Sequence, residues 1–158
     1  MWLGVHAPAR VNKLVLANTS PFLGPADAWE KRIDAVRKGG MAAIADGVLE
    51  RWFTPAFRER GAADVRAVRE ALLGTPTEGY CGCCAAIRDM DQRASLGAIR
   101  LPTLVIGGTH DPATTPAMCR DLAGAITGAR YVELPAAHLS NIEAADVFNQ
   151  AVADFLLA

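Results

Sequence analysis

The sequence predicts an α/β fold in which parallel strands form the core and a long helical segment is inserted between two of them. Short apolar runs at residues 13–17, 103–107 and 131–134 are typical of parallel strands covered on both faces. Helical patterns follow the second and third runs, as expected for strands joined by helical crossovers. Residues 26–97, between the first two runs, carry helical patterns only.

The first 25 residues predict the end of a core helix and a core strand. Residues 1–7, MWLGVHA, resemble the last turns of a buried helix that Pro8 ends, and no capping residue precedes them. We therefore expect the chain to begin inside a longer element. The strand at 13–17 needs a neighbour on each side, so an unpaired edge there predicts self-association. Residues 18–20 follow it as candidates for lining a pocket or, more ordinarily, for making a turn.

Residues 26–97 predict a helical insertion, which we interpret as a lid. Apolar residues recur at helical spacing in four stretches separated by Gly or Pro, at 29–38, 41–52, 65–72 and 84–90. A crossover between parallel strands needs only about a dozen residues. The insertion is therefore long enough to be a structure of its own.

Residues 98–158 predict a regular alternation of strands and helices. The expected order is a strand at 103–107, a helix at 116–125, a strand at 131–134 and a helix at 144–157. This order implies a parallel sheet with right-handed crossovers.

The composition argues against several classes of function. The 158 residues carry 16 Lys and Arg against 17 Asp and Glu, so the net charge is −1 and no basic field would attract nucleic acid or an anionic membrane. No apolar run approaches the roughly 20 residues of a membrane helix, and no signal-peptide pattern opens the chain. We expect a cytoplasmic protein with a small-molecule ligand.

The cysteines do not have the spacing of a disulfide framework. Cys81, Cys83 and Cys84 crowd into one short stretch, and Cys119 is distant from them in sequence. A thiolate metal site made by all four is an alternative, but zinc sites usually show two separated pairs. We expect no metal, and interpret the cluster as small residues where a helix packs closely.

Two polar residues follow predicted strand ends and suggest catalytic chemistry. Asp111 comes shortly after the strand at 103–107, and His138 comes shortly after the strand at 131–134. The carboxyl ends of parallel neighbours meet at one edge of a sheet, where active sites collect. Asp before His is the chain order of the acid and base in one type of nucleophile–base–acid triad. Alone, each is equally an ordinary loop residue; together they suggest half of a triad.

Four segments of the chain resemble the α/β-hydrolase fold and, more narrowly, the 3-oxoadipate enol-lactonases of aromatic degradation by the protocatechuate branch. They are VNKLVLANT at 11–19, CCAAIRDMD at 83–91, PTLVIGGTHDPAT at 102–114 and VELPAAHLSN at 132–141. The second of these, in the lid, indicates the narrower family. The likeness covers nearly the whole chain and corresponds to the C-terminal part of such a hydrolase.

The resemblance implies that Asp111 is the triad acid and His138 the base of a serine hydrolase that needs no cofactor. The family's nucleophile lies in G-x-S-x-G, and none of the three serines, Ser20, Ser95 and Ser140, has that setting. The resemblance thus implies hydrolysis of a lactone or ester by the complete protein, and an inactive fragment when this chain stands alone.

Three further residues are candidates for substrate binding. Trp52 would wall the pocket over a flat lactone ring, although a buried lid aromatic is as good an interpretation. Arg88 would bind the free carboxylate of the substrate, or else form a surface ion pair with Asp91. Leu139 is a candidate because it follows His138 directly.

Other functions remain open on the sequence. A carboxylesterase, a carbon–carbon bond hydrolase or a cofactor-free haloperoxidase would keep the acid and base and change the lid. A non-catalytic α/β module for binding or assembly would dispense with the nucleophile.

Overall fold

The computed structural model describes all residues from 1 to 158 and separates them into two compact units. The sheet unit comprises residues 1–21 and 92–158, and the helical unit comprises residues 22–91. The sequence predicts a helical insertion that includes residues 92–97. In the structure they belong to the sheet unit, because Leu96 and Ile99 pack into the core beside the sheet.

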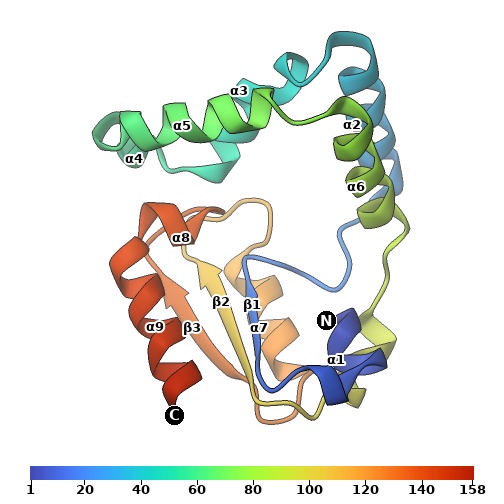
Figure 1. The fold of residues 1–158 in the computed structure, drawn as a ribbon, viewed down its shortest axis with the longest axis vertical. Coiled ribbons are helices and arrows are strands. Elements are labelled where there is room, and N and C mark those ends of the chain that lie inside the picture. The colour runs from blue at the N-terminus through green and yellow to red at the C-terminus, as the bar shows by residue number, and fades with distance from the viewer. The chain divides into compact units, whose positions relative to one another are not determined.

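The sheet unit contains three strands, four α-helices and two 3₁₀ turns (Figure 1). In chain order its elements are α1 (Trp2–His6), η1 (Pro8–Arg10), β1 (Leu14–Ala17), η2 (Arg93–Ala98), β2 (Thr103–Gly108), α7 (Pro116–Gly124), β3 (Arg130–Leu134), α8 (Ser140–Glu143) and α9 (Ala145–Leu157).

The three strands form a parallel sheet in the order β1-β2-β3, which confirms the predicted fold class. Leu16 pairs with Val105, and Ile106 pairs with Val132. Every residue of the central strand β2 is buried, as its continuous apolar sequence predicts. Within this sheet β1 pairs only with β2, so the second neighbour expected for β1 is not one of these strands.

Helices cover both faces of the sheet, because successive side chains of β2 point in opposite directions. Val105 packs with Cys119 and Leu122 of α7 on one face. On the other face, Leu104 and Ile106 pack with apolar residues of α9, including Phe155. Figure 1 shows the strands between these two helices.

The helical unit consists of five helices: α2 (Ala26–Gly39), α3 (Ala42–Trp52), α4 (Pro55–Arg60), α5 (Ala62–Leu73) and α6 (Thr77–Asp89). Helix α4 lies between two of the predicted helical stretches, and its start carries the usual signals, with Pro55 at its first position and Thr54 as its capping residue. Its core combines Ile33 and Val36 of α2 with the buried Cys81 and Cys84 of α6.

The four cysteines are all free, and both units contain some of them. Cys81 and Cys84 are buried in the helical unit, Cys83 is exposed, and Cys119 is buried in the sheet unit. No group of three or more His, Cys, Asp or Glu side chains is arranged to hold a metal ion. No helix combines the length and the apolar character needed to cross a bilayer.

Candidate active site

The loop that carries Asp111 is fastened to the loop that carries His138. Beyond the last residue of β2, the N–H of Thr109 donates to the carbonyl of Leu134 (2.9 Å), and the N–H of His110 donates to the carbonyl of Ala136 (3.0 Å). The pairing of β2 with β3 thus continues past the end of the sheet. This backbone contact brings together two residues that are 27 positions apart in sequence.

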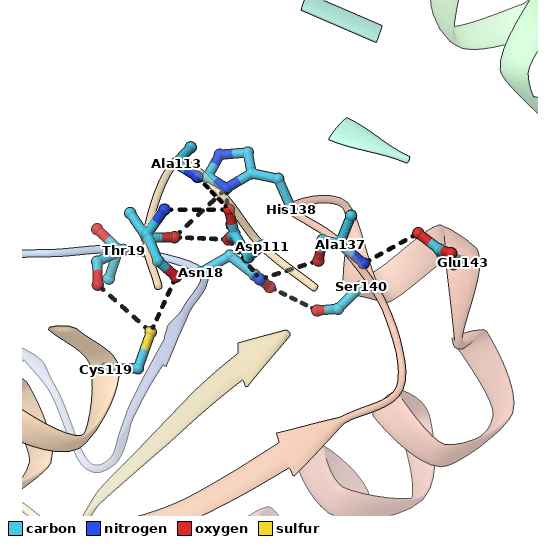
Figure 2. Close-up of polar contacts among 10 residues, drawn as sticks. Asn18, Thr19, Asp111, Ala113, Cys119, Ala137, His138, Ser140 and Glu143 are labelled. Carbon is cyan, nitrogen blue, oxygen red and sulfur yellow. Dashed lines mark hydrogen bonds and ion pairs between the residues drawn. The ribbon is translucent and has the colours of Figure 1, made fainter. Parts of the chain in front are cut away.

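Asp111 and His138 are in direct contact. The Nδ1 atom of His138 lies 2.8 Å from Oδ2 of Asp111 (Figure 2). The carboxylate is fully buried, and the imidazole side chain retains 24% of its exposure. A buried acid that orients a partly exposed imidazole is the arrangement of the acid and base in a catalytic triad.

Five hydrogen bonds converge on the Asp111 carboxylate. Oδ1 accepts from the backbone N–H groups of Ala113 (2.8 Å) and Thr114 (3.0 Å). Oδ2 accepts from the hydroxyl of Thr114 (2.7 Å) and the side-chain amide of Asn18 (3.1 Å), in addition to its contact with His138. Burial alone would raise the pKa of this carboxyl, but the hydrogen bonds from His138 and Thr114 outweigh it and lower the pKa to about 2.

The ionised acid fixes the tautomer of the imidazole. At neutral pH the Asp111 carboxylate can only accept hydrogen bonds. The proton between the two side chains therefore resides on Nδ1 of His138, which donates it to Asp111. In the neutral ring Nε2 then carries a lone pair and can take a proton from a nucleophile.

Most of the residues that support this pair are not among the candidates that the sequence predicts. Thr114, Ser140 and Glu143 are buried polar residues beside it, and Asn18 was noted only as a possible pocket or turn residue. The side chain of Glu143 accepts from the N–H of Ala137 (3.0 Å), the residue before His138. The sequence signal that these residues share is their place within a few positions of a strand end or of a catalytic candidate, but that signal does not identify their hydrogen-bond partners.

The remaining serines and histidines do not form a second site in the sheet unit. Ser20 and Ser140 are buried, and the hydroxyl of Ser95, in η2, donates to the carbonyl of Gln92 (3.0 Å). His110 is exposed, and the ring of His6 lies against that of Trp2 with 4.7 Å between centroids.

The candidate substrate-binding residues have different surroundings. Trp52 ends α3 and packs against the core of the helical unit. Arg88 donates to Glu30 (2.6 Å) and to both oxygens of Asp89 (2.7 and 2.8 Å), and its hydrogen bonds to Asp89 and Glu30 raise its pKa. The alternative ion pair expected with Asp91 is thus replaced by two other acidic partners. Leu139 is half-buried and precedes α8.

The chain is similar to known proteins over most of its length. The alpha/beta hydrolase fold family matches residues 48–145. Two enzymes of Acinetobacter baylyi are similar in sequence: 3-oxoadipate enol-lactonase 2 is 40% identical over 151 residues, and 3-oxoadipate enol-lactonase 1 is 31% identical over 156 residues. The matches cover 96% and 99% of this chain but 57% and 59% of those proteins.

A solved structure agrees closely with the fold. The crystal structure of the enol-lactonase from Burkholderia xenovorans LB400 superposes with a TM-score of 0.96 at 45% identity, over 99% of this chain and 60% of that one. The chain thus spans less than two thirds of the length of these relatives. With a family match over more than half of its residues and an acid–imidazole pair at the sheet edge, the chain belongs to the alpha/beta hydrolase fold family.

Proposed function

We propose that the protein containing this chain is a serine-triad hydrolase that opens the lactone ring of a 3-oxoadipate enol-lactone, in the protocatechuate branch of aromatic catabolism. The observation that carries the proposal is the 2.8 Å contact between His138 and the buried Asp111. The choice of substrate is supported by the similarity to proteins named 3-oxoadipate enol-lactonase.

In the proposed reaction His138 is the general base and acid, and Asp111 is its orienting partner. Nε2 of His138 takes the proton of a serine hydroxyl as that hydroxyl attacks the lactone carbonyl, and Asp111 stabilises the imidazolium that forms. The 158 residues contain no G-x-S-x-G sequence. The proposal therefore assigns the nucleophile and the N–H donors for the oxyanion to residues outside this chain.

The chemistry of the substrate suits such a site. When the ring C–O bond breaks, the leaving group is an enolate that becomes a ketone on protonation, so it departs more readily than a simple alkoxide. His138 then activates water, which hydrolyses the acyl-enzyme and regenerates the serine. The proposed steps are proton transfers and acyl transfers, so the proposal includes no metal and no organic cofactor.

The residues of this chain proposed to contact the substrate are Trp52, Arg88 and Leu139. Arg88 is proposed for the free carboxylate, because a guanidinium can bind a carboxylate through two parallel hydrogen bonds. Its present partners, Glu30 and Asp89, would have to share or release it.

The proposal is tested by assaying the complete protein, expressed from its full coding sequence, for consumption of the enol-lactone. His138→Ala and Asp111→Asn should each reduce kcat by several orders of magnitude. His110→Ala is the matched control, because the imidazole of His110 is exposed and lies on the loop that carries Asp111. A complete protein that leaves the lactone intact but hydrolyses simple esters, or cleaves carbon–carbon bonds, would replace the substrate assignment and keep the triad. Unchanged hydrolysis in His138→Ala would contradict the triad itself.

A further inference from the structure

We infer that Asn18 is a positioning residue for the acid–imidazole pair, joining the ends of all three strands through one side-chain amide. The expected effect on catalysis rests on the proposed function. The contacts of Asn18 rest only on the geometry of the sheet unit. Asn18 directly follows β1, whereas Asp111 and His138 follow β2 and β3.

The backbone of Asn18 adopts a conformation that few residues tolerate. Its φ is +45°, and it is the only residue other than glycine with a positive φ. Asparagine is among the few side chains that enter this left-handed region readily. Unusual backbone angles of this kind concentrate at functional sites, where the surrounding contacts hold them in place.

The side-chain amide of Asn18 is satisfied on both sides. Its Nδ2 donates to Oδ2 of Asp111 (3.1 Å) and to the carbonyl of Ala137 (3.3 Å). Its Oδ1 accepts from the hydroxyl of Ser140 (2.5 Å), a residue with no exposed surface (Figure 2). One amide thus contacts the acid, the residue before the base and the first residue of α8.

The orientation of this amide is dictated by its neighbours. The ionised Asp111 and the Ala137 carbonyl can only accept, so the group that faces them must be the NH₂ of Asn18. Its oxygen then faces Ser140, whose hydroxyl must be the donor. Asp in place of Asn18 would set a second carboxylate against two acceptors.

Asn18 differs from the other hydrogen-bond donors to the Asp111 carboxylate because it also contacts the loop that carries His138. Thr114 and Ala113 lie within three residues of Asp111 and hold it locally. Asn18 holds both Asp111 and the backbone next to His138, so its loss removes the side-chain link between the two loops. The backbone hydrogen bonds of Thr109 and His110 would then hold the loops together without fixing the Asp111 side chain against the imidazole. Small displacements of catalytic groups are costly to the rate.

The test distinguishes the effect of the Asn18 side-chain amide from the effect of the positive φ at this position. Asn18→Gly keeps the positive φ without strain and removes only the side chain. In the complete protein, expressed from its full coding sequence, the hydrogen-bonded Nδ1–H proton of His138 is followed by NMR, together with the thermal unfolding transition. The signal of His138 is assigned as the one that His138→Ala removes. Asn12→Gly, at the opposite end of β1, is the control because its side chain is exposed.

We expect the Nδ1–H signal of His138 to broaden or disappear in Asn18→Gly and to persist in Asn12→Gly. In the complete protein, kcat should fall roughly 10- to 100-fold with KM within twofold. An unchanged Nδ1–H signal in a folded Asn18→Gly chain would overturn the inference, whether or not the lactone proves to be the substrate. If Asn18→Gly does not fold, Ser140→Ala carries the test: it should weaken the same signal, and an unaltered signal overturns the inference.

Discussion

The end of β2 and the residue before His138 are in backbone contact. A Cβ atom on Gly108 would lie 2.4 Å from the carbonyl oxygen of Ala137 and 2.5 Å from that of Ala136. Only glycine at this position lets the loop that carries Asp111 and the loop that carries His138 approach this closely. The short distance between Asp111 and His138 therefore depends on residue 108 having no Cβ atom.

Gly108→Ala should disturb the acid–imidazole pair. The new methyl group meets backbone rather than a flexible side chain, so the loop of residues 136–138 must shift. We expect the free energy of unfolding to fall by about 1–3 kcal/mol, measured by urea denaturation, and kcat of the complete protein to fall with it. Gly124→Ala is the control, because a Cβ there meets nothing within 4 Å. Equal stability in the two variants would contradict the close contact.

The buried Asp111 should make stability depend on acid pH. Its pKa is lowered from 3.8 to about 2 in the folded chain, so the folded state holds fewer protons than the unfolded state in that range. The stabilisation is complete above about pH 4 and is lost as the pH falls to about 2, a change of about 2 kcal/mol.

Acid titration of unfolding, measured on the wild type and on Asp111→Asn, checks this dependence. The loss of stability between about pH 4 and about pH 2 should be smaller in the variant by roughly that amount. Asp121→Asn, which removes an exposed carboxylate on α7, should follow the wild type. Parallel curves for all three proteins would rule out a depressed pKa at Asp111.

Arg88→Gln should raise KM of the complete protein for the enol-lactone about 10-fold or more while changing kcat little. A charge-assisted bond to the substrate carboxylate contributes about 1.5–3 kcal/mol, and the neutral amide cannot replace it. Arg69→Gln is the control, because Arg69 forms an exposed ion pair with Asp46 in the same unit. A KM that stays at the wild-type value would assign Arg88 a structural role, with Glu30 and Asp89 as its only partners.

The 158-residue chain alone should not turn over esters. It holds an acid and a base, but its Ser20 and Ser140 are buried and none of its serines lies in G-x-S-x-G. Purified chain mixed with p-nitrophenyl acetate should show only the background rate. Saturable hydrolysis that disappears in His138→Ala would refute this expectation.

The chain alone should also self-associate. Strand β1 pairs with β2 on one side only, and unpaired strand edges bind other strands. Sedimentation velocity over a range of concentrations should show dimers or larger species. A single monomeric boundary at all concentrations, with a cooperative melt, would count against association through β1.

Much of the fold was already determined by the sequence, because the relevant signals are local. The continuous apolar runs that become β1, β2 and β3 predict a buried parallel sheet, and the long interval between the first two predicts a separate helical unit. The positions of Asp111 and His138 just after strand ends predict that they lie at one edge of the sheet. The start of α6 was less predictable, since it begins at Thr77 in a stretch rich in glycine.

Only the tertiary structure decided how the acid–imidazole pair is supported. Asn18 lies 93 residues from Asp111 and 122 from Ser140, and no local pattern in the sequence links them. The final predicted helix, at 144–157, is preceded by the separate short helix α8, whose Glu143 is turned inward to hold the N–H of Ala137. Hydrogen bonds between distant segments form only once the sheet has set its register, and for that reason the sequence predicts the two catalytic candidates but not the side chains that hold them.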